Sequence, residues 1–570
     1  MRYLYKSLNI YRKELILGPF FKLLEAVLEL FVPVVMASLI DSGIRTGNRP
    51  HIYWMGIALL GLAVFGLAFA LLCQYAAAVA STGFSKSLRG RLFSQISTFG
   101  YEELDAVSAN SLITRLTNDV NLAETSVAMF IRLAVRAPFI IMGAAVMAML
   151  IDFQMSLIFV VIIPLVSLVL YTVMWRAVPF YNKRQEKLDD VSLIAKENLE
   201  GARVIRAFSK VGNENERFST AAKEVQEIAT KVGNLSALLN PSILIILNGA
   251  ILAILWFGGQ QVNLGSLTQG QVIALVSYTT QISHMLIVLA NLIILFTRAG
   301  ASFRRIIEIF EIQPKMVEGQ FSGDVSKGVP KVQFKDVSFK YPCTEELALS
   351  SLSFEVAEGM TVGIIGATGS GKSSLINLMP RFYDVSSGNI LIDGVDVKEY
   401  DFERLRTKFG MAPQQAVLFE GTIGENLTLA DASAGDLELD RAVDAAQARD
   451  VVENKGGYEG IIEQNGRNLS GGQRQRLTIA RALVGNPEIV ILDDSSSALD
   501  YATDAALRKS LKNFKEDLTV FIVSQRANSV QHADLILVLE EGCLVGAGTH
   551  EELMKISPVY QEICQSQEVA

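Results

Sequence analysis

The sequence predicts a membrane protein of two parts: an all-α domain of six spanning helices with long helical extensions, followed by an α/β domain. Half of the 570 residues are hydrophobic, and the long apolar runs all lie before about residue 300. The later part alternates apolar runs of strand length with segments of helical periodicity. We therefore expect a membrane domain over 1–310, a linker over 311–331 and an α/β domain over 332–570.

Each apolar run is long enough to cross a bilayer, which takes about 20 helical residues. The predicted spans are 15–40, 54–79, 128–151, 156–175, 238–258 and 271–297. The segments between the second and third spans, and between the fourth and fifth, are long and contain no clusters of proline and glycine. Both keep helical periodicity, so we expect membrane helices that continue well beyond the bilayer and reverse at short turns.

The distribution of charge predicts the orientation of these spans. Residues 176–231 carry 11 lysines and arginines, whereas the loops 151–154 and 259–270 carry none. Basic loops stay on the cytoplasmic side, so we expect the extensions, both termini and the α/β domain to be cytoplasmic. No signal peptide is predicted at the N-terminus, and the expected location is the cell membrane, which in a bacterium is the inner membrane. The net charge of -8 argues against a nucleic-acid partner.

Several charged side chains fall inside the predicted spans. Lys22, Glu25 and Glu29 share one helical face, which is compatible with a stripe that lines a water-filled cavity. The alternative is that such groups reach towards the membrane boundary and pair with one another. For Arg132 and Arg136 in the third span, pairing is the favoured interpretation.

A complete phosphate-binding loop lies between the apolar run 361–365 and a helical segment, which is the context that this motif requires. Its glycines let backbone N–H groups approach phosphates, its lysine reaches the β- and γ-phosphates, and its first serine can bind Mg²⁺. The predicted ATP-binding residues here are Gly366, Thr368, Gly369, Ser370, Gly371, Lys372, Ser373 and Ser374. Asp493 ends a later apolar strand and is suited to hold the same metal ion.

Between these two motifs lies a second glycine-rich turn, at 469–473. The order of the motifs resembles the ATP-binding-cassette (ABC) family, and the six spans with long extensions resemble its exporter branch; the resemblance covers almost the whole chain. It implies that Tyr341 stacks on adenine and that Gln414 contacts Mg²⁺. It also implies that the signature residues Ser470, Gly471, Gly472 and Gln473 contact the γ-phosphate of ATP held by the opposite subunit.

The resemblance extends to segments at the subunit and domain boundaries. Residues 497–500 match the loop that crosses the dimer interface, and 111–119 and 197–208 match segments beside the turns that dock on the ATPase domains. In this family, two ATP sites form between two ATPase domains. Because this chain has one copy of each motif, it is expected to pair with itself or with a related chain.

Two residues depart from the family pattern at the catalytic positions. Asp494 stands where a glutamate is proposed to polarise the attacking water, and its carboxylate is one methylene shorter. Gln525 stands where a histidine contacts the γ-phosphate, and a glutamine can donate a hydrogen bond but carries no charge. The remaining ATP-binding motifs and the signature are intact, so we expect a site that binds ATP and hydrolyses it slowly.

These departures favour one half of a heterodimeric, ATP-driven exporter of amphipathic small molecules such as drugs or lipid-like compounds. Its signature would complete the active site of a related partner chain. One alternative is a homodimeric lipid or peptide exporter with slow hydrolysis. Another is an ATP-gated regulator or channel subunit without active transport.

Overall fold

The computed structural model of the chain describes residues 2–568, except 322, 324–327, 343 and 496. The chain divides into two compact units, each described by itself below. The first comprises Met1–Ser97 and Asn110–Glu311, and the second comprises Thr98–Ala109 and Ile312–Ala570. The expected linker 311–331 contains residues 322 and 324–327, which lie outside the described part of the chain.

Six helical stretches of the described residues are long and apolar enough to cross a membrane. They are Leu4–Ile44, Arg49–Ile96, Ala109–Ile151, Phe153–Glu200, Val211–Asn263 and Gln269–Glu311. Each contains one of the six predicted spans, so that prediction is confirmed. Every stretch has more than 40 residues, about twice the length that a bilayer requires, so the helices continue beyond any membrane that they cross.

The first unit consists of helices, some of which include short 3-10 or π-helical segments (η). They are α1 (Arg2–Leu8), η1 (Asn9–Tyr11), α2 (Arg12–Ser38), η2 (Leu39–Ile44), α3 (Arg49–Ile96), α5 (Ala109–Thr114), η3 (Arg115–Asp119), α6 (Val120–Met129), η4 (Phe130–Ala134), α7 (Arg136–Ile151), α8 (Phe153–Glu200), α9 (Ala202–Ala207), α10 (Val211–Ala237), α11 (Leu239–Asn263) and α12 (Gln269–Glu311). The break between α7 and α8 is a single extended residue, Asp152, whose carboxylate accepts the Met155 N–H at 2.8 Å and caps α8.

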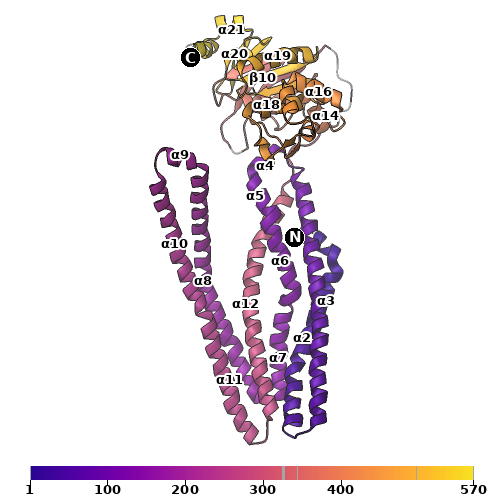
Figure 1. The fold of residues 1–570 in the computed structure, drawn as a ribbon, viewed down its shortest axis with the longest axis vertical. Helices are drawn as coiled ribbons and strands as arrows, with labels where there is room; N and C mark the ends of the chain where they lie inside the picture. Colours follow the sequence, from indigo (N-terminus) through magenta and orange to yellow (C-terminus); the bar gives the residue numbers. More distant parts are fainter. Residues whose placement is uncertain (1, 322, 324–327, 343, 496, 569–570) are drawn as a thin grey trace. The chain divides into compact units, whose positions relative to one another are not determined.

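The second long segment of the sequence forms the predicted helical extension. Helix α8 continues far past its apolar half, the chain reverses through α9, and α10 returns along α8 (Figure 1). Gly201 ends α8, and its N–H donates to the Glu197 carbonyl at 2.8 Å. The prediction of a continuous helix that reverses at a short turn is therefore confirmed for this segment.

Four of the five charged side chains inside the predicted spans form ion pairs, whereas the Nε atom of Arg132, for which pairing was also predicted, is buried without a hydrogen-bond partner among the described residues. Lys22 is 6% exposed, and its ammonium group lies 2.7 Å from the Glu25 carboxylate, one turn along α2. Arg136 of α7 contacts Glu29 of α2 at 2.5 Å. These pairs match the pairing interpretation, which lowers the cost of placing charge in an apolar region.

A short helix, α4 (Tyr101–Val107), belongs to the second unit although the sequence places it between two spans. The Tyr101 ring stacks on Phe382 with 4.6 Å between ring centroids, and the Tyr383 hydroxyl donates to Asp105 at 2.7 Å. Burial and the hydrogen bond with Asp105 raise the pKa of Tyr383. This helix lies just before 111–119, the segment that the resemblance places beside a docking turn.

The α/β part of the second unit contains three sheets. Their strands are β1 (Val332–Phe339), β2 (Leu349–Val356), β3 (Thr361–Gly366), β4 (Ser387–Ile392), β5 (Val395–Asp396), β6 (Phe409–Ala412), β7 (Gly421–Thr422), β8 (Ile461–Ile462), β9 (Ile489–Asp493), β10 (Thr519–Ser524), β11 (Leu535–Glu540) and β12 (Cys543–Gly548). A four-stranded sheet has the order β2-β1-β4-β5, a six-stranded sheet has the order β12-β11-β3-β10-β9-β6, and β7 pairs with β8. Strands β11, β3, β10, β9 and β6 are parallel, which confirms the predicted α/β class.

The remaining helices of this unit connect or flank the strands. They are α13 (Lys372–Leu378), α14 (Phe402–Thr407), α15 (Ile423–Leu427), α16 (Asp436–Ala445), α17 (Arg449–Asn454), η5 (Gln464–Gly466), α18 (Gly471–Leu483), α19 (Tyr501–Phe514), α20 (Ala527–Val530), α21 (His550–Ile556) and α22 (Pro558–Glu568).

The central strands β3, β10 and β9 of the six-stranded sheet are buried on both faces. Along β9, Val490 and Leu492 pack into one hydrophobic cluster, whereas Ile489 and Ile491 pack into another that includes the four-stranded sheet. This alternation follows from the two-residue period of a strand. Because both faces are covered, β9 reads as a continuous apolar run in the sequence.

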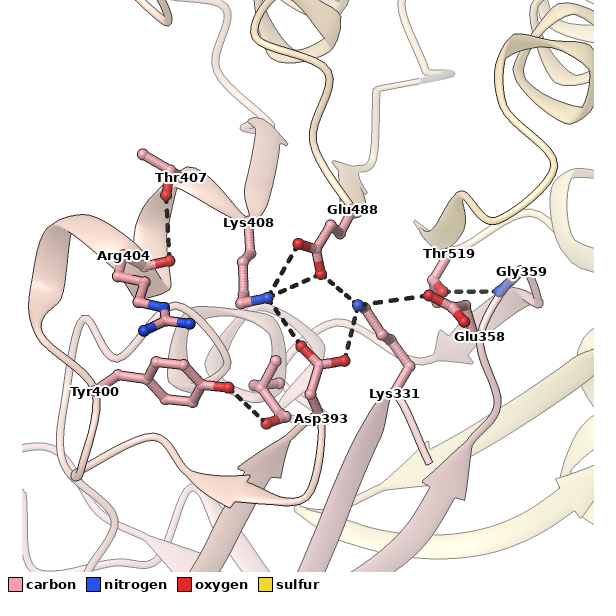
Figure 2. Close-up of polar contacts among 11 residues, drawn as sticks. Lys331, Glu358, Gly359, Asp393, Tyr400, Arg404, Thr407, Lys408, Glu488 and Thr519 are labelled. Carbon is pink, nitrogen blue, oxygen red and sulfur yellow. Dashed lines mark hydrogen bonds and ion pairs between the residues drawn. The ribbon is translucent and has the colours of Figure 1, made fainter. Parts of the chain in front are cut away.

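A closed ring of charges lies beside the amino ends of β6 and β9 (Figure 2). Lys331 contacts Asp393 at 2.8 Å and also pairs with Glu488. Lys408 contacts the same two carboxylates at 3.0 and 2.9 Å. Lys331 and Asp393 flank strands of the four-stranded sheet, so the ring joins the two sheets at this edge.

Candidate ATP-binding site

The phosphate-binding loop follows β3 and adopts the backbone shape that its glycines permit. Gly369 and Gly371 have φ of 84° and 95°, a region that favours glycine. A Cβ atom at Gly366 would lie 2.2 Å from the Leu539 carbonyl oxygen, so this position has no room for a side chain. A Cβ atom at Gly369 would meet nothing within 4 Å, so the loop is open on that side.

Lys372 begins α13, and its ammonium group is held inside the loop. It donates to the carbonyls of Gly366 and Ala367 at 2.9 and 2.7 Å. Burial lowers the pKa of Lys372, although the nearby charges of Asp493 and Asp494 act in the opposite direction. A buried cation that is bound by neutral loop oxygens suits an anionic ligand, because phosphate oxygens are stronger partners than carbonyls.

Ser373 and Asp493 form the second part of the site. The Ser373 hydroxyl donates to the two Asp493 carboxylate oxygens at 3.4 and 3.2 Å, which brings the end of β9 beside the start of α13. Burial raises the pKa of Asp493, and the neighbouring Asp494 carboxylate adds to this effect. A buried carboxylate, its half-buried neighbour and a hydroxyl form a donor set of the kind that Mg²⁺ prefers.

Tyr341 lies at the opposite side of the site, just after β1. Its hydroxyl lies 3.0 Å from the Ser374 hydroxyl, and its ring meets Tyr383 edge-on with 5.4 Å between centroids. The hydroxyl contact thus links Tyr341 to α13, and the ring contact packs it against Tyr383. These contacts place Tyr341 beside the phosphate-binding loop, and its stacking on adenine stays a prediction.

Asp494 follows β9 in a left-handed backbone conformation with φ of 45°, which aspartate tolerates better than most residues. Its N–H donates to the Val523 carbonyl at 3.0 Å, and its side chain is hydrogen-bonded with Gln414. Burial raises the pKa of Asp494, while Arg526 and Lys372 oppose that shift. The predicted catalytic carboxylate is therefore held beside the predicted Mg²⁺-contacting glutamine.

Gln525 follows β10, and its side chain reaches the phosphate-binding loop. The Thr368 hydroxyl lies 3.4 Å from the Gln525 side-chain oxygen. The Gln525 side chain is exposed, so packing contributes little to its orientation. Gln525 therefore faces the phosphate-binding loop, where a glutamine lacks the charge that a histidine can carry.

Most of the predicted residues meet in one cavity of about 600 Å³. Its walls include Tyr341, Thr368, Gly369, Gly371, Lys372, Ser373, Ser374, Gln414, Asp493, Asp494 and Gln525. Gly366 and Ser370 belong to the same loop but lie behind this surface. The cavity combines a phosphate-binding loop, a metal-binding pair and an aromatic side chain, so the residues present fit ATP with Mg²⁺.

The signature residues lie outside this cavity, at the start of α18. The Ser470 hydroxyl accepts the Gln473 N–H at 3.3 Å, and the Gln473 side chain accepts the Ser470 N–H at 2.9 Å. Ser470 and Gly471 are exposed, and a Cβ atom at Gly471 would meet nothing within 4 Å. The amino end of a 13-residue helix is thus open to solvent, where backbone N–H groups favour an anion.

Sequence reasoning missed several residues that line the cavity. They are Glu346, Leu347, Ala348, Val523, Ser524, Glu541 and Gly542. Glu541 and Gly542 form the tight turn between β11 and β12, with φ of 46° and 79°, and the Gly542 N–H donates to the Ser370 carbonyl at 3.3 Å. The glycine after an apolar run signals a turn, but nothing local in the sequence signals its place beside the phosphate-binding loop.

Comparisons with known proteins agree with this geometry. Residues 15–286 match the family of the ABC transporter transmembrane region, and residues 349–497 match the ABC transporter family. The chain is 37% identical to the ABC transporter ATP-binding protein YfiB of Bacillus subtilis, over 96% of this chain and 95% of that protein. It is 30% identical to the ATP-dependent lipid A-core flippase of Yersinia pestis, over 99% of this chain and 97% of the flippase.

Among solved structures, a bacterial Atm1-family ABC exporter with ATP bound has the same fold, with a TM-score of 0.82 and 23% identity. The match covers 98% of this chain and all of that one. Both family regions, the two relatives and the fold lead to one conclusion. The chain belongs to the ABC transporter family, as a half-transporter in which a six-helix membrane domain precedes an ABC ATPase domain.

Proposed function

We propose that this chain is one half of a two-chain, ATP-driven exporter, and that its own ATP site retains nucleotide and hydrolyses it slowly. One observation carries the proposal. A single cavity holds a complete set of phosphate- and metal-binding groups, whereas its two catalytic positions are occupied by Asp494 and Gln525.

The groups that hold the ligand are assigned by their chemistry. Lys372 and the loop N–H groups bind the phosphates, Ser373 and Asp493 hold Mg²⁺ together with Gln414, and Tyr341 stacks on adenine. When bound, Mg²⁺ would offset the negative charge of the phosphates. All of these binding residues are of the types that the motifs require. The chain therefore keeps the capacity to bind ATP, independently of its capacity to hydrolyse it.

The catalytic weakness follows from distance and charge. An aspartate places its carboxylate about 1.5 Å further back than a glutamate, and an error of about 1 Å in a catalytic group costs on the order of 100-fold in rate. Gln525 can donate a hydrogen bond to a phosphate but supplies no positive charge in the transition state. With both changes, ATP is hydrolysed slowly, stays bound for a long time and holds two ATPase domains together.

The open signature at the start of α18 supports the second half of the proposal. Ser470 and Gly471 are exposed and intact, so they can complete a competent site on a related chain. We propose that this partner carries a glutamate and a histidine at the positions that match Asp494 and Gln525. Two copies of the present chain would instead assemble two slow sites.

We further propose that the substrate is an amphipathic small molecule or a lipid-like compound. The name of the flippase relative, which is 30% identical over nearly the full length, supports a lipid-like substrate. The proposed site of action is the cell membrane, with the ATPase domain on the cytoplasmic side, because residues 176–231 carry the basic excess.

The test is the ATPase activity of the purified chain in lipid nanodiscs, alone and with the copurified partner. We expect slow turnover alone and a large increase with the partner. We also expect Ser470→Ala to remove most of that increase, with Ser433→Ala, an exposed serine outside the cavity, the signature and residues 497–500, as a control. Fast turnover by the chain alone would contradict the two-chain proposal and would favour a homodimeric exporter, whereas substrate flow down its gradient without turnover would favour a channel or regulator.

A further inference from the structure

The C-terminal helix α22 reaches the loop that carries Gln525. The Gln567 side-chain amide donates to the Gln525 carbonyl at 2.7 Å, and the Ala527 N–H donates to the Gln567 side-chain oxygen at 2.8 Å. One side chain therefore bridges the two backbone groups on either side of Arg526. It also satisfies the first N–H of α20, one of the groups at a helix start that has no partner within the helix.

This bridge adds to a small number of other contacts that hold the loop, namely the burial of Ala527 and the Ser529 N–H, which donates to the Arg526 carbonyl at 3.1 Å. The side chains of Gln525 and Arg526 are both exposed, so packing does not fix their orientation. Inside the loop, the Arg526 N–H donates to the Ser524 hydroxyl at 3.0 Å. On the cavity side, the contact between Gln525 and Thr368 is long, at 3.4 Å. The shortest of these hydrogen bonds are the two made by Gln567.

Helix α22 is itself anchored to the core of the ATPase domain. Tyr560 is fully buried, and its hydroxyl lies 2.8 Å from the His550 ring nitrogen. Cys564, one turn later, is also buried in the cluster that contains Ala527. Residues 560, 564 and 567 lie on one face of the helix, because they are spaced by four and three positions. Gln567 follows the two buried residues on this face, although its own side chain is exposed.

We propose that Gln567 is a positioning residue for the ATP site. It holds the backbone of residues 525–527 so that the Gln525 side chain faces the phosphate-binding loop, and it thereby slows the release of bound ATP. The inference rests on the proposed contact between Gln525 and ATP. It does not depend on a second chain.

The first measurement tests the geometry without nucleotide. Gln567→Met keeps the length of the side chain and its helix propensity but removes both hydrogen bonds. Gln565→Met, at an exposed position of the same helix, is the matched control. Hydrogen exchange of the Ala527 amide in the full-length protein should be several-fold faster in Gln567→Met and unchanged in Gln565→Met. Equal exchange in the two variants would overturn the proposal.

The second measurement tests the role in binding. We expect the dissociation of radiolabelled ATP, in the presence of Mg²⁺, to be about 3- to 10-fold faster in Gln567→Met, as expected for one or two lost hydrogen bonds. The effect should disappear when Gln525→Ala is already present, because the two positions then no longer act together. An undiminished effect in that background, or release as slow as in Gln565→Met, would overturn the proposal.

Both measurements use the single full-length chain. A negative result therefore leaves the two-chain exporter proposal intact. Conversely, if the chain alone turns over ATP rapidly, the two-chain proposal fails while the coupling between positions 567 and 525 is still measured.

Discussion

The two ends of the six-stranded sheet hold buried charges in opposite ways. At the amino end, burial alone would lower the pKa of Lys331 and Lys408, but their hydrogen bonds to Asp393 and Glu488 outweigh it and both pKa values rise. Burial alone would raise the pKa of Glu488, but the same lysines lower it. The charges of Lys331, Lys408 and Glu488 are therefore stabilised by the fold (Figure 2).

At the carboxyl end the shifts have the opposite sign. Burial lowers the pKa of Lys372 and raises the pKa values of Asp493 and Asp494. Here the fold disfavours the charged forms of these three side chains. A bound ligand must therefore supply the opposite charges that stabilise them. The directions of the pKa shifts thus distinguish a structural cluster at the amino end from a binding site at the carboxyl end. Lysine and carboxylate side chains occur at both ends.

The largest expected effect comes from breaking the amino-end ring. Lys408→Met leaves Asp393 and Glu488 with one lysine, and removing one partner of a buried ion pair costs about 3–5 kcal/mol. Because Glu488 is partly exposed, we expect the lower end of that range. The unfolding temperature of the ATPase domain should fall by about 6–12 °C. The affinity of the folded protein for ATP should stay within about twofold, as in the exposed control Lys335→Met, and a parallel loss of affinity would contradict the comparison.

Removing the lysine at the carboxyl end should do the reverse. Lys372→Met removes a buried cation that only loop oxygens hold, so we expect little change in unfolding temperature without nucleotide. The affinity for ATP with Mg²⁺ should fall by about 100-fold, through the loss of charge-assisted hydrogen bonds to phosphate. Calorimetric titration and thermal unfolding of the same sample check both parts. A drop in stability as large as that of Lys408→Met would show that Lys372 is structural.

A smaller effect should follow from restoring the catalytic carboxylate. Asp494→Glu extends the side chain towards the cavity, and we expect turnover at this chain's own site to rise by about 10- to 100-fold. Asp494→Asn should change turnover by less than about twofold, because the native aspartate contributes little. Steady-state phosphate release from the purified chain measures both variants. Loss of turnover in Asp494→Asn would show that the aspartate already acts as the catalytic base.

The smallest expected effect is a difference in pH dependence between the two ends. The lowered pKa of Glu488 stabilises the fold above the ordinary pKa of glutamate, and this contribution is lost as pH falls through the lowered value. Glu488→Gln should therefore be less stable than the wild type at pH 7, and the two proteins should become equally stable in acid.

The raised pKa of Asp494 affects stability in the opposite direction, so Asp494→Asn should be more stable than the wild type at pH 7 without nucleotide.

This difference for Asp494→Asn should develop as pH rises from the ordinary pKa of aspartate through the raised value. Thermal unfolding between pH 4 and pH 8, with and without Mg²⁺ and ATP, checks both signs. If Glu488→Gln and Asp494→Asn changed the stability at pH 7 in the same direction, the distinction between the two ends of the sheet would be contradicted.

Local patterns in the sequence predicted much of the fold and the site. Lys372 and Ser373 lie in a contiguous motif, and Asp493 ends an unbroken apolar strand, so residue order alone identified them. The six spans were predictable because a bilayer imposes a minimum apolar length. Glu541 and Gln567 escaped prediction, since a turn and a helix end show no sign of which distant loop they contact.

The sequence by itself determined the class of the molecule and its phosphate-binding motif, because these depend on residue type and short spacing, and it supplied Asp494 and Gln525, on which the proposal of a slow site rests. The tertiary structure alone decided that α4 packs with the ATPase domain, that Lys331 and Lys408 share two carboxylates, and that Gln567 holds the Gln525 loop. These features join residues far apart in the chain, and only folding places such groups within hydrogen-bonding distance. The sign of each pKa shift likewise depends on burial and on partners, neither of which can be read from a motif.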